Sequence, residues 1–150
     1  MEIKYSSELP ENVTREGTRR TLNYNVRELS EKELKELWEK ETNKDGVSYD
    51  SFARQHKYAY NSVSIGMGRW NYQGIVEAII RDKYTADEME AITNNMNAIT
   101  GEFFNVLVTD GIIKATKYLV DSINSENTAN FTEMQAWRAM AKRTAKEIFV

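Results

Sequence analysis

The residues best suited to chemistry by type and spacing begin with a run of oxygen ligands between residues 43 and 54. Four of them stand at nearly alternate positions, as in calcium-binding loops: Asn43, Asp45, Ser48 and Asp50. The glycine of this run, Gly46, stands at the wrong offset, and Arg54 takes the place of the glutamate that completes such a loop. The run therefore does not predict a calcium site.

Two other motifs are similarly incomplete. The run SIGMGRW places Gly66 and Gly68 before an expected helix, but it lacks the third glycine, the lysine and the hydroxyl residue of a phosphate-binding loop. We interpret it as a turn. The carboxylates of Asp87, Glu88 and Glu90 fall in the first turn of an expected helix, where acidic residues are favoured electrostatically, so they do not indicate acid–base catalysis.

The composition excludes further classes of site. The chain has no cysteine, which excludes disulfides, thiolate nucleophiles and cysteine-ligated metals. Its one histidine, His56, excludes sites that need two imidazoles, and its polar neighbourhood predicts a surface side chain. We expect no catalytic, cofactor-binding or metal-binding residues, no cofactor and no enzyme activity.

Charge and hydropathy limit the partners and the location. The net charge of −3 gives no long-range attraction to nucleic acid, which we do not expect as a partner. The most apolar stretch, from Phe103 to Val120, is interrupted by charged residues and falls short of the roughly 20 apolar residues of a membrane span, so we expect no membrane. The opening MEIKYSSELP has no apolar core of a secretory signal, which predicts a protein that stays where it is made.

Hydrophobic periodicity predicts an α+β fold, mainly α. Residues 1–18 are polar and are expected to form an arm, followed by a single domain over residues 19–150. In its strand-rich part, residues 19–66, two extended segments flank a helix that starts at a Ser30/Glu33 capping box. We expect a short antiparallel β-hairpin or ribbon, packed on a C-terminal bundle of about four helices in residues 67–150.

The helical part has three further signals. A possible Asn71 cap and a Thr85/Glu88 capping box predict two helix starts. Gly101 is expected to open another helix, and SINSENTAN is expected to be a loop before the last one. Between Gly101 and Ile123 the apolar residues crowd more than one helix face, which predicts a buried helix or an interface.

Aromatic and basic residues are the candidates for binding. A cluster surrounds Lys57: Arg54, His56, Lys57, Tyr58 and Tyr60. It fits three interpretations: a surface that stacks and neutralises single-stranded nucleic acid, a solvated strand whose cations prevent edge pairing, or a protein contact. Tyrosine and tryptophan also anchor protein interfaces, and the chain has eight tyrosines and three tryptophans. The expected partner-binding residues are Tyr5, Arg19, Arg20, Tyr58, Tyr60, Trp70, Phe103 and Phe104.

Two segments carry a resemblance to a known group of proteins. WNYQGIVEAIIRDKYTADEMEAITNNM, Trp70 to Met96, and FTEMQAWRAMAKRTAKEI, Phe131 to Ile148, resemble small proteins of tailed bacteriophages of Bacteroidetes, including crAss-like phages. The matching residues are of helix-packing and capping type, so the resemblance implies a phage context and no catalytic residue.

The expected function is therefore non-enzymatic. The chain is expected to be a structural or assembly protein of a virion, made in the host cytoplasm. It would dock on capsid, neck (head–tail connector) or tail neighbours through its arm and its aromatic residues, as a homo-oligomer or as part of a ring or shell. The alternative is a phage-encoded regulator or inhibitor that binds a host protein or nucleic acid.

Overall fold

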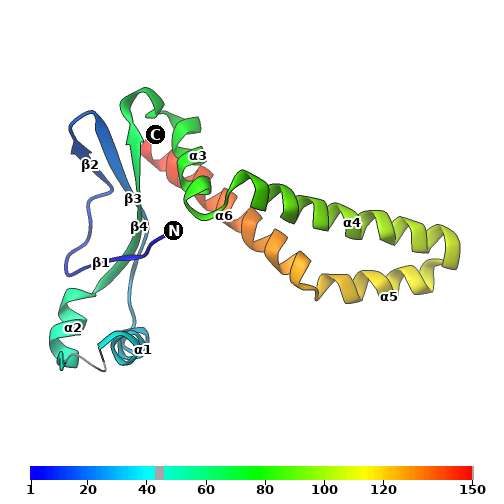
Figure 1. Cartoon of the computed structure of the whole chain (residues 1–150), viewed down its shortest axis with the longest axis horizontal. Coiled ribbons are helices and arrows are strands. Elements are labelled where there is room, and N and C mark those ends of the chain that lie inside the picture. The colour runs from blue at the N-terminus through cyan, green and yellow to red at the C-terminus, as the bar shows by residue number, and fades with distance from the viewer. Residues whose placement is uncertain (43–45, 150) are drawn as a thin grey trace. The chain divides into compact units, whose positions relative to one another are not determined.

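The computed structural model describes residues 1–42 and 46–149, and the chain divides into two compact units. The first unit is Met1–Gly74 and the second is Ile75–Val150. Figure 1 labels their helices and strands. The division lies within the part of the chain that we expected to be helical, in the first turn of a helix, and not at the change in composition near Gly66.

The first unit is built on an antiparallel sheet, which has four strands in the described part of the chain. In chain order these are β1 (Lys4–Ser6), β2 (Val13–Glu16), β3 (Arg19–Glu28) and β4 (Tyr58–Gly66). Their order across the sheet is β1-β4-β3-β2, so the N-terminal segment supplies both edges (Figure 1). The expected arm is thus part of the sheet, because the outer N–H and C=O groups of a two-stranded ribbon pair with it.

A bulge interrupts the long central strand β3. Its register against β4 shifts between Tyr24 and Arg27, and Asn25 has a φ of 53°. Asparagine adopts this left-handed conformation more readily than most residues. The Asn25 side chain donates a hydrogen bond to Oδ1 of the buried Asn61 (3.1 Å), whose own amide donates to the carbonyl of Glu2 (3.1 Å). The bulge therefore connects β3 to the N-terminal segment through a buried amide.

Helix α1 (Glu31–Thr42) starts where the sequence predicts. The Ser30 backbone N–H donates to the Glu33 carboxylate (3.0 Å), and the Glu33 N–H donates back to the Ser30 hydroxyl (3.3 Å). The Trp38 ring then contacts the Tyr49 ring edge to face, with centroids 5.9 Å apart. The capping-box prediction is confirmed.

Helix α2 (Tyr49–Gln55) was not predicted from the sequence. Ser48 caps it by accepting a hydrogen bond from the Ser51 N–H (3.3 Å), and Phe52 is its buried residue. A helix of two turns with one buried position carries too little periodicity to be recognised. The ring of His56, at its C-terminal end, stacks on Phe52 at 3.9 Å, so this histidine is half-buried and not a simple surface side chain.

The second unit is helical. A short 3₁₀ turn, Met67–Arg69, precedes α3 (Tyr72–Lys83), and α4 (Ala86–Asp110), α5 (Ile112–Ile123) and α6 (Glu126–Ile148) follow. Figure 1 shows α4 running antiparallel to α5 and then to α6. The Thr85/Glu88 capping box is present, with bonds of 2.7 and 3.1 Å. The Asn71 side chain caps α3 through the Gly74 N–H (2.9 Å).

Two predicted boundaries in this unit are wrong. Helix α4 continues through Gly101, and the break comes at Gly111, which has a φ of 85° and a ψ of 176°. That backbone conformation is open almost only to glycine, whereas Gly101 costs a helix only about 1 kcal/mol. The expected loop SINSENTAN is mostly helix, because Ser125 caps α6 through the Thr128 N–H.

The fold is α+β and mainly helical, with antiparallel strands at the N-terminus, as the sequence predicts. A side-chain cluster in the second unit links α3 to α6: the Trp137 Nε1–H donates to the Ile79 carbonyl (3.0 Å), and Lys83 forms an ion pair with Glu133. Within residues 1–42 and 46–149, none of the helices combines the length and the hydropathy that a membrane span needs.

Candidate interaction site

The structure separates the eight predicted partner-binding residues into three groups. The first group, on β1 and β4, is Tyr5, Tyr58 and Tyr60. The second group, at the other end of the sheet, is Arg19, Arg20 and Trp70. The third group, on α4, is Phe103 and Phe104. The first two groups belong to the first unit and the third to the second unit.

The three tyrosines do not form one surface. Tyr5 pairs with Ala59, and neighbouring residues of a strand point to opposite faces, so Tyr5 lies on the face opposite to Tyr58 and Tyr60. The Tyr5 ring is half-buried and lies 5.1 Å from the His56 ring. Burial, followed by the charge of Glu41, raises the pKa of the Tyr5 hydroxyl. Strand β4 is central in the sheet, so the interpretation of its cations as guards of an exposed edge is wrong.

Of the second group only Arg20 and Trp70 come together, because Arg19 and Arg20 are neighbours on β3 and point to opposite faces of the sheet. Both guanidinium groups have contacts within the chain. The Arg19 guanidinium donates to the hydroxyl and to the carbonyl of Ser64, both at 2.8 Å. The Arg20 guanidinium lies over the Trp70 ring, 5.0 Å from its centroid. These contacts connect β3 to β4 and to the turn after β4, which gives the group a structural role.

The third group borders a large apolar surface. Phe103 is half-buried, whereas Phe104 is 57% exposed, and their rings meet edge to face at 5.6 Å. Further along, Val108 is 86% exposed and Ile113 is 84% exposed. We call the whole set the open face: Phe104, Val108, Ile112, Ile113, Leu119, Val120 and Ile123. The sequence indicated an interface in this stretch, but only its phenylalanines were among the predicted residues.

Helical periodicity explains why these side chains are outside. Six half-buried apolar residues of α4 follow alternating steps of three and four, as in a coiled-coil seam: Met89, Ile92, Met96, Ile99, Phe103 and Val106. Leu107 is also half-buried and lies beside this stripe. On α5 the corresponding inner residues are Ala115, Tyr118 and Ser122, two of which are small and buried. The larger residues of α5 lie on the adjacent stripe, so packing against α4 leaves them exposed.

The exposed stripes of the two helices lie on the same side of the hairpin. On α4, Phe104 and Val108 lie about 110–150° from the middle of the seam, counted in the chain direction at 100° per residue. On α5, Leu119, Ile112 and Ile123 lie about 70–110° from the middle of the seam in the same sense, and Val120 and Ile113 lie about 170–190° from it. Two antiparallel right-handed helices place stripes of similar displacement on one side of their common plane. The seven residues therefore form one surface, with Val120 and Ile113 at its outer edge on α5.

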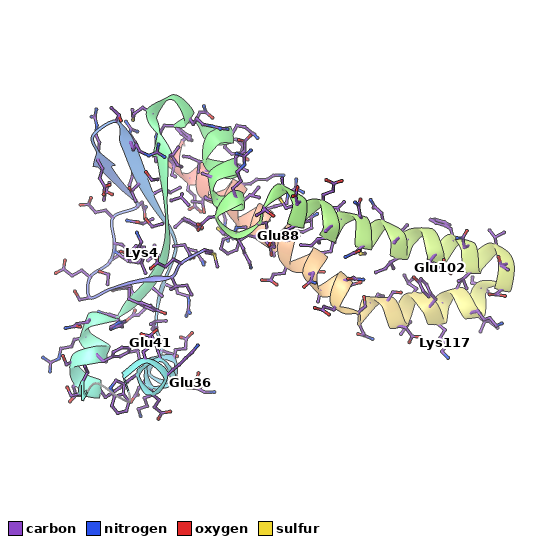
Figure 2. The ribbon with its side chains drawn as sticks, in the orientation of Figure 1. Lys4, Glu36, Glu41, Glu88, Glu102 and Lys117 are labelled. Carbon is purple, nitrogen blue, oxygen red and sulfur yellow. The ribbon has the colours of Figure 1, made fainter. Side chains whose placement is uncertain are left out.

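The open face has little polar chemistry. The Thr116 hydroxyl, which lies among its residues, donates to the Ile112 carbonyl (2.7 Å), and the Thr100 hydroxyl donates to the Met96 carbonyl (3.3 Å). Within residues 103–123 there are two acidic and two basic side chains, which give a net charge of zero: Asp110, Lys114, Lys117 and Asp121. Figure 2 shows Lys117 on α5 and Glu102 on α4. This arrangement can exclude water from an apolar contact.

A groove in the first unit lies beside α1, and its lining includes Tyr5, Arg27, Glu33 and Lys40. Glu33 accepts hydrogen bonds from the Ser30 backbone N–H and from Arg27 (2.6 Å), which lower its pKa to about 2. Ser30 and Glu33 cap α1, so the lowered pKa of the Glu33 carboxylate has a structural cause.

Across residues 1–42 and 46–149, no three Asp, Glu or His side chains are grouped so that they could hold a metal ion. Asn43 and Asp45, from the calcium-like run, lie outside the described residues. Comparisons with protein-family models, with curated proteins and with solved structures found no match. The open face is therefore the candidate site.

Proposed function

We propose that this chain is a non-enzymatic binding and assembly protein that acts as a structural component of a phage particle. The observation that carries the proposal is the open face on α4 and α5. Its seven large apolar residues lie side by side with their neighbouring hydroxyls bonded internally. Burying each such side chain in a contact is worth about 1.5–3 kcal/mol, which favours a packed partner over water.

The size of the open face also supports binding. At about 25 cal/mol per Å², these values correspond to roughly 60–120 Å² for a fully exposed side chain. The seven residues are 39–86% exposed, so together they expose on the order of 400 Å². The largest apolar patch of a typical monomer is about 300–600 Å² and is often functional, and the open face lies within that range.

The phage context is supported by the resemblance of residues 70–96 and 131–148 to small phage proteins. In this chain those residues are mostly in α3, α4 and α6, where they supply caps and packing residues such as Thr85, Met89 and Met134. A capsid, neck or tail neighbour would meet the chain through the open face, which lies outside both segments.

Quantitative mass spectrometry of purified particles of the phage that encodes the chain tests this proposal. We expect a fixed copy number relative to the major capsid protein, related to the symmetry of a ring or shell. A matched experiment uses phage that encode Val108→Glu, with Thr109→Glu as the control on a neighbouring polar position. Loss of the first variant from particles, with retention of the second, is the expected result. Absence of the wild-type chain from particles would refute the virion role.

A regulator that binds nucleic acid is the second candidate, because α6 carries three exposed cations within two turns: Lys142, Arg143 and Lys146. Helical spacing places them on one side of the helix. Binding through phosphates would weaken steeply with salt, and replacing the three cations by glutamine would remove it. The net charge of −3 makes this the weaker proposal.

A further inference from the structure

We propose that the partner of the open face is a second copy of this chain, so that two α4–α5 hairpins form a four-helix bundle. The inference rests on the proposed function, because it names the first partner of the same surface. It assigns to the seven residues of the open face the role of the dimer core.

The α4–α5 hairpin has almost no core of its own. All of α4 is described, and none of its 25 residues is fully buried. The buried residues of α5 are Ala115 and Ser122, which are small. Two helices can bury one stripe each against one another, and bundles gain their core by adding further helices. A second hairpin laid on the open face supplies the missing layer.

The area of the open face fits a contact between two copies. A standard interface buries about 800 Å² per partner, with an apolar centre and a polar rim. The open face exposes on the order of 400 Å² of apolar surface, and polar residues such as Thr100, Asn105 and Lys117 flank it. Since about 56–65% of an interface is apolar, this corresponds to roughly 600–700 Å² per partner, at the low end of a standard interface.

The charge of the hairpin also favours a second copy as the partner. Residues 103–123 carry no net charge, although the whole chain has −3, so two copies meet there without repulsion. A helix that binds a membrane surface usually carries several lysines or arginines on its polar side, whereas α5 has two lysines and one aspartate. A strongly charged protein partner would likewise find no opposite charge. A two-fold contact only needs the same apolar surface on both sides.

Sedimentation equilibrium of the full chain over a range of concentrations tests the inference. We expect a monomer–dimer equilibrium, with a dimer of twice the 17.4 kDa chain mass. Val108→Glu should weaken the dimer at least about 100-fold, since a two-fold contact buries the introduced carboxylate twice. Thr109→Glu adds the same charge in the same last turn of α4, outside the open face, and should leave the dimer unchanged.

Other results would overturn the inference without touching the proposed function. A wild-type chain that stays monomeric, yet needs Val108 for incorporation into particles, would assign the open face to a different protein. Co-sedimentation of a monomeric chain with uncharged phosphatidylcholine vesicles would assign it to a lipid surface. Equal dimerisation of wild type and Val108→Glu would place the dimer contact elsewhere. Circular dichroism of both variants checks that the fold is retained, as expected for two exposed positions.

Discussion

The first unit and the α4–α5 hairpin of the second unit use the same kinds of apolar residue with opposite results. In the first unit, Leu22 is 1% exposed and Phe52 is 3% exposed, because both lie in the core of the unit that contains the sheet and its helices. In the α4–α5 hairpin, Val108 and Ile113 are almost fully exposed. Residue type does not explain this difference. A sheet with helices encloses a core within one chain, whereas a two-helix hairpin offers only one contact stripe per helix.

The comparison indicates that the α4–α5 hairpin carries the candidate binding surface. Exposed single apolar residues are ordinary on protein surfaces, but a contiguous set needs a cause. The first unit encloses large apolar side chains such as Leu22 and Phe52, whereas the hairpin leaves a contiguous apolar surface exposed.

The largest effect is expected from deleting residues 1–16. The deletion removes β1 and β2, which cover both edges of the β3–β4 pair, and it also removes the Glu2 carbonyl that accepts from buried Asn61. We expect the first unit to lose its cooperative thermal unfolding and the NMR dispersion of β3 and β4. Deletion of Met1 alone is the control. A truncated chain with an unchanged melting temperature would restore the interpretation of these residues as an arm.

A pair of alanine substitutions tests the contrast directly. Leu22→Ala creates a cavity in the first unit and should lower the free energy of unfolding by about 2–5 kcal/mol. Ile113→Ala should change it by less than about 0.5 kcal/mol. Both are measured by denaturant titration in a Val108→Glu background, so that self-association does not contribute. A comparable loss for Ile113→Ala would show that the hairpin buries this residue within the single chain.

Local signals in the sequence predicted the local structure. The Ser30/Glu33 and Thr85/Glu88 boxes fixed two helix starts, since each involves residues only three positions apart. The strand pattern around Leu22 and the extended segment around Tyr60 also predicted the central pair of the sheet. These features depend on neighbours in the chain, so one sequence is enough to see them.

Features that depend on distant residues were missed. Residues 1–18 look like an arm because their strands are short and polar, and their pairing with β3 and β4 is decided by free strand edges elsewhere. For the candidate site, periodicity showed that the stretch up to Ile123 is apolar on more than one face. It could not show which stripe meets α4, because Ala115 and Ser122, not the larger residues, form the inner side of α5.

A smaller effect is expected from two glycines of the hairpin. Gly111→Ala forces a side chain into a backbone conformation with a φ of 85° and should cost about 1–3 kcal/mol. Gly101→Ala lies within α4, has no neighbouring atom near the added methyl group, and should stabilise the helix by about 0.5–1 kcal/mol. Thermal unfolding of each variant in the Val108→Glu background shows whether the substitution raises or lowers the free energy of unfolding. A loss at Gly101 would support a helix boundary there.

The smallest effect concerns acid stability at the cap of α1. The pKa of Glu33 is lowered from 4.5 to about 2, first by the Ser30 backbone N–H and then by Arg27. Since the folded pKa lies below the unfolded one, this carboxylate stabilises the fold above about pH 4.5, and its contribution is lost as the pH falls toward 2. Glu33→Gln should therefore flatten the stability profile between these two values, as measured by denaturant titration.

Arg27→Met separates the two causes of the Glu33 shift. It removes the ion pair but keeps the Ser30 bond, so the pKa of Glu33, followed by carboxyl NMR, should rise and still remain below 4.5. The Thr85 box at α4 is the natural comparison, because the pKa of Glu88 is lowered by the Thr85 bonds alone. A return of the Glu33 pKa to 4.5 in Arg27→Met would show that the arginine, and not the cap, lowers this pKa. The two boxes would then differ in mechanism despite the same local sequence pattern.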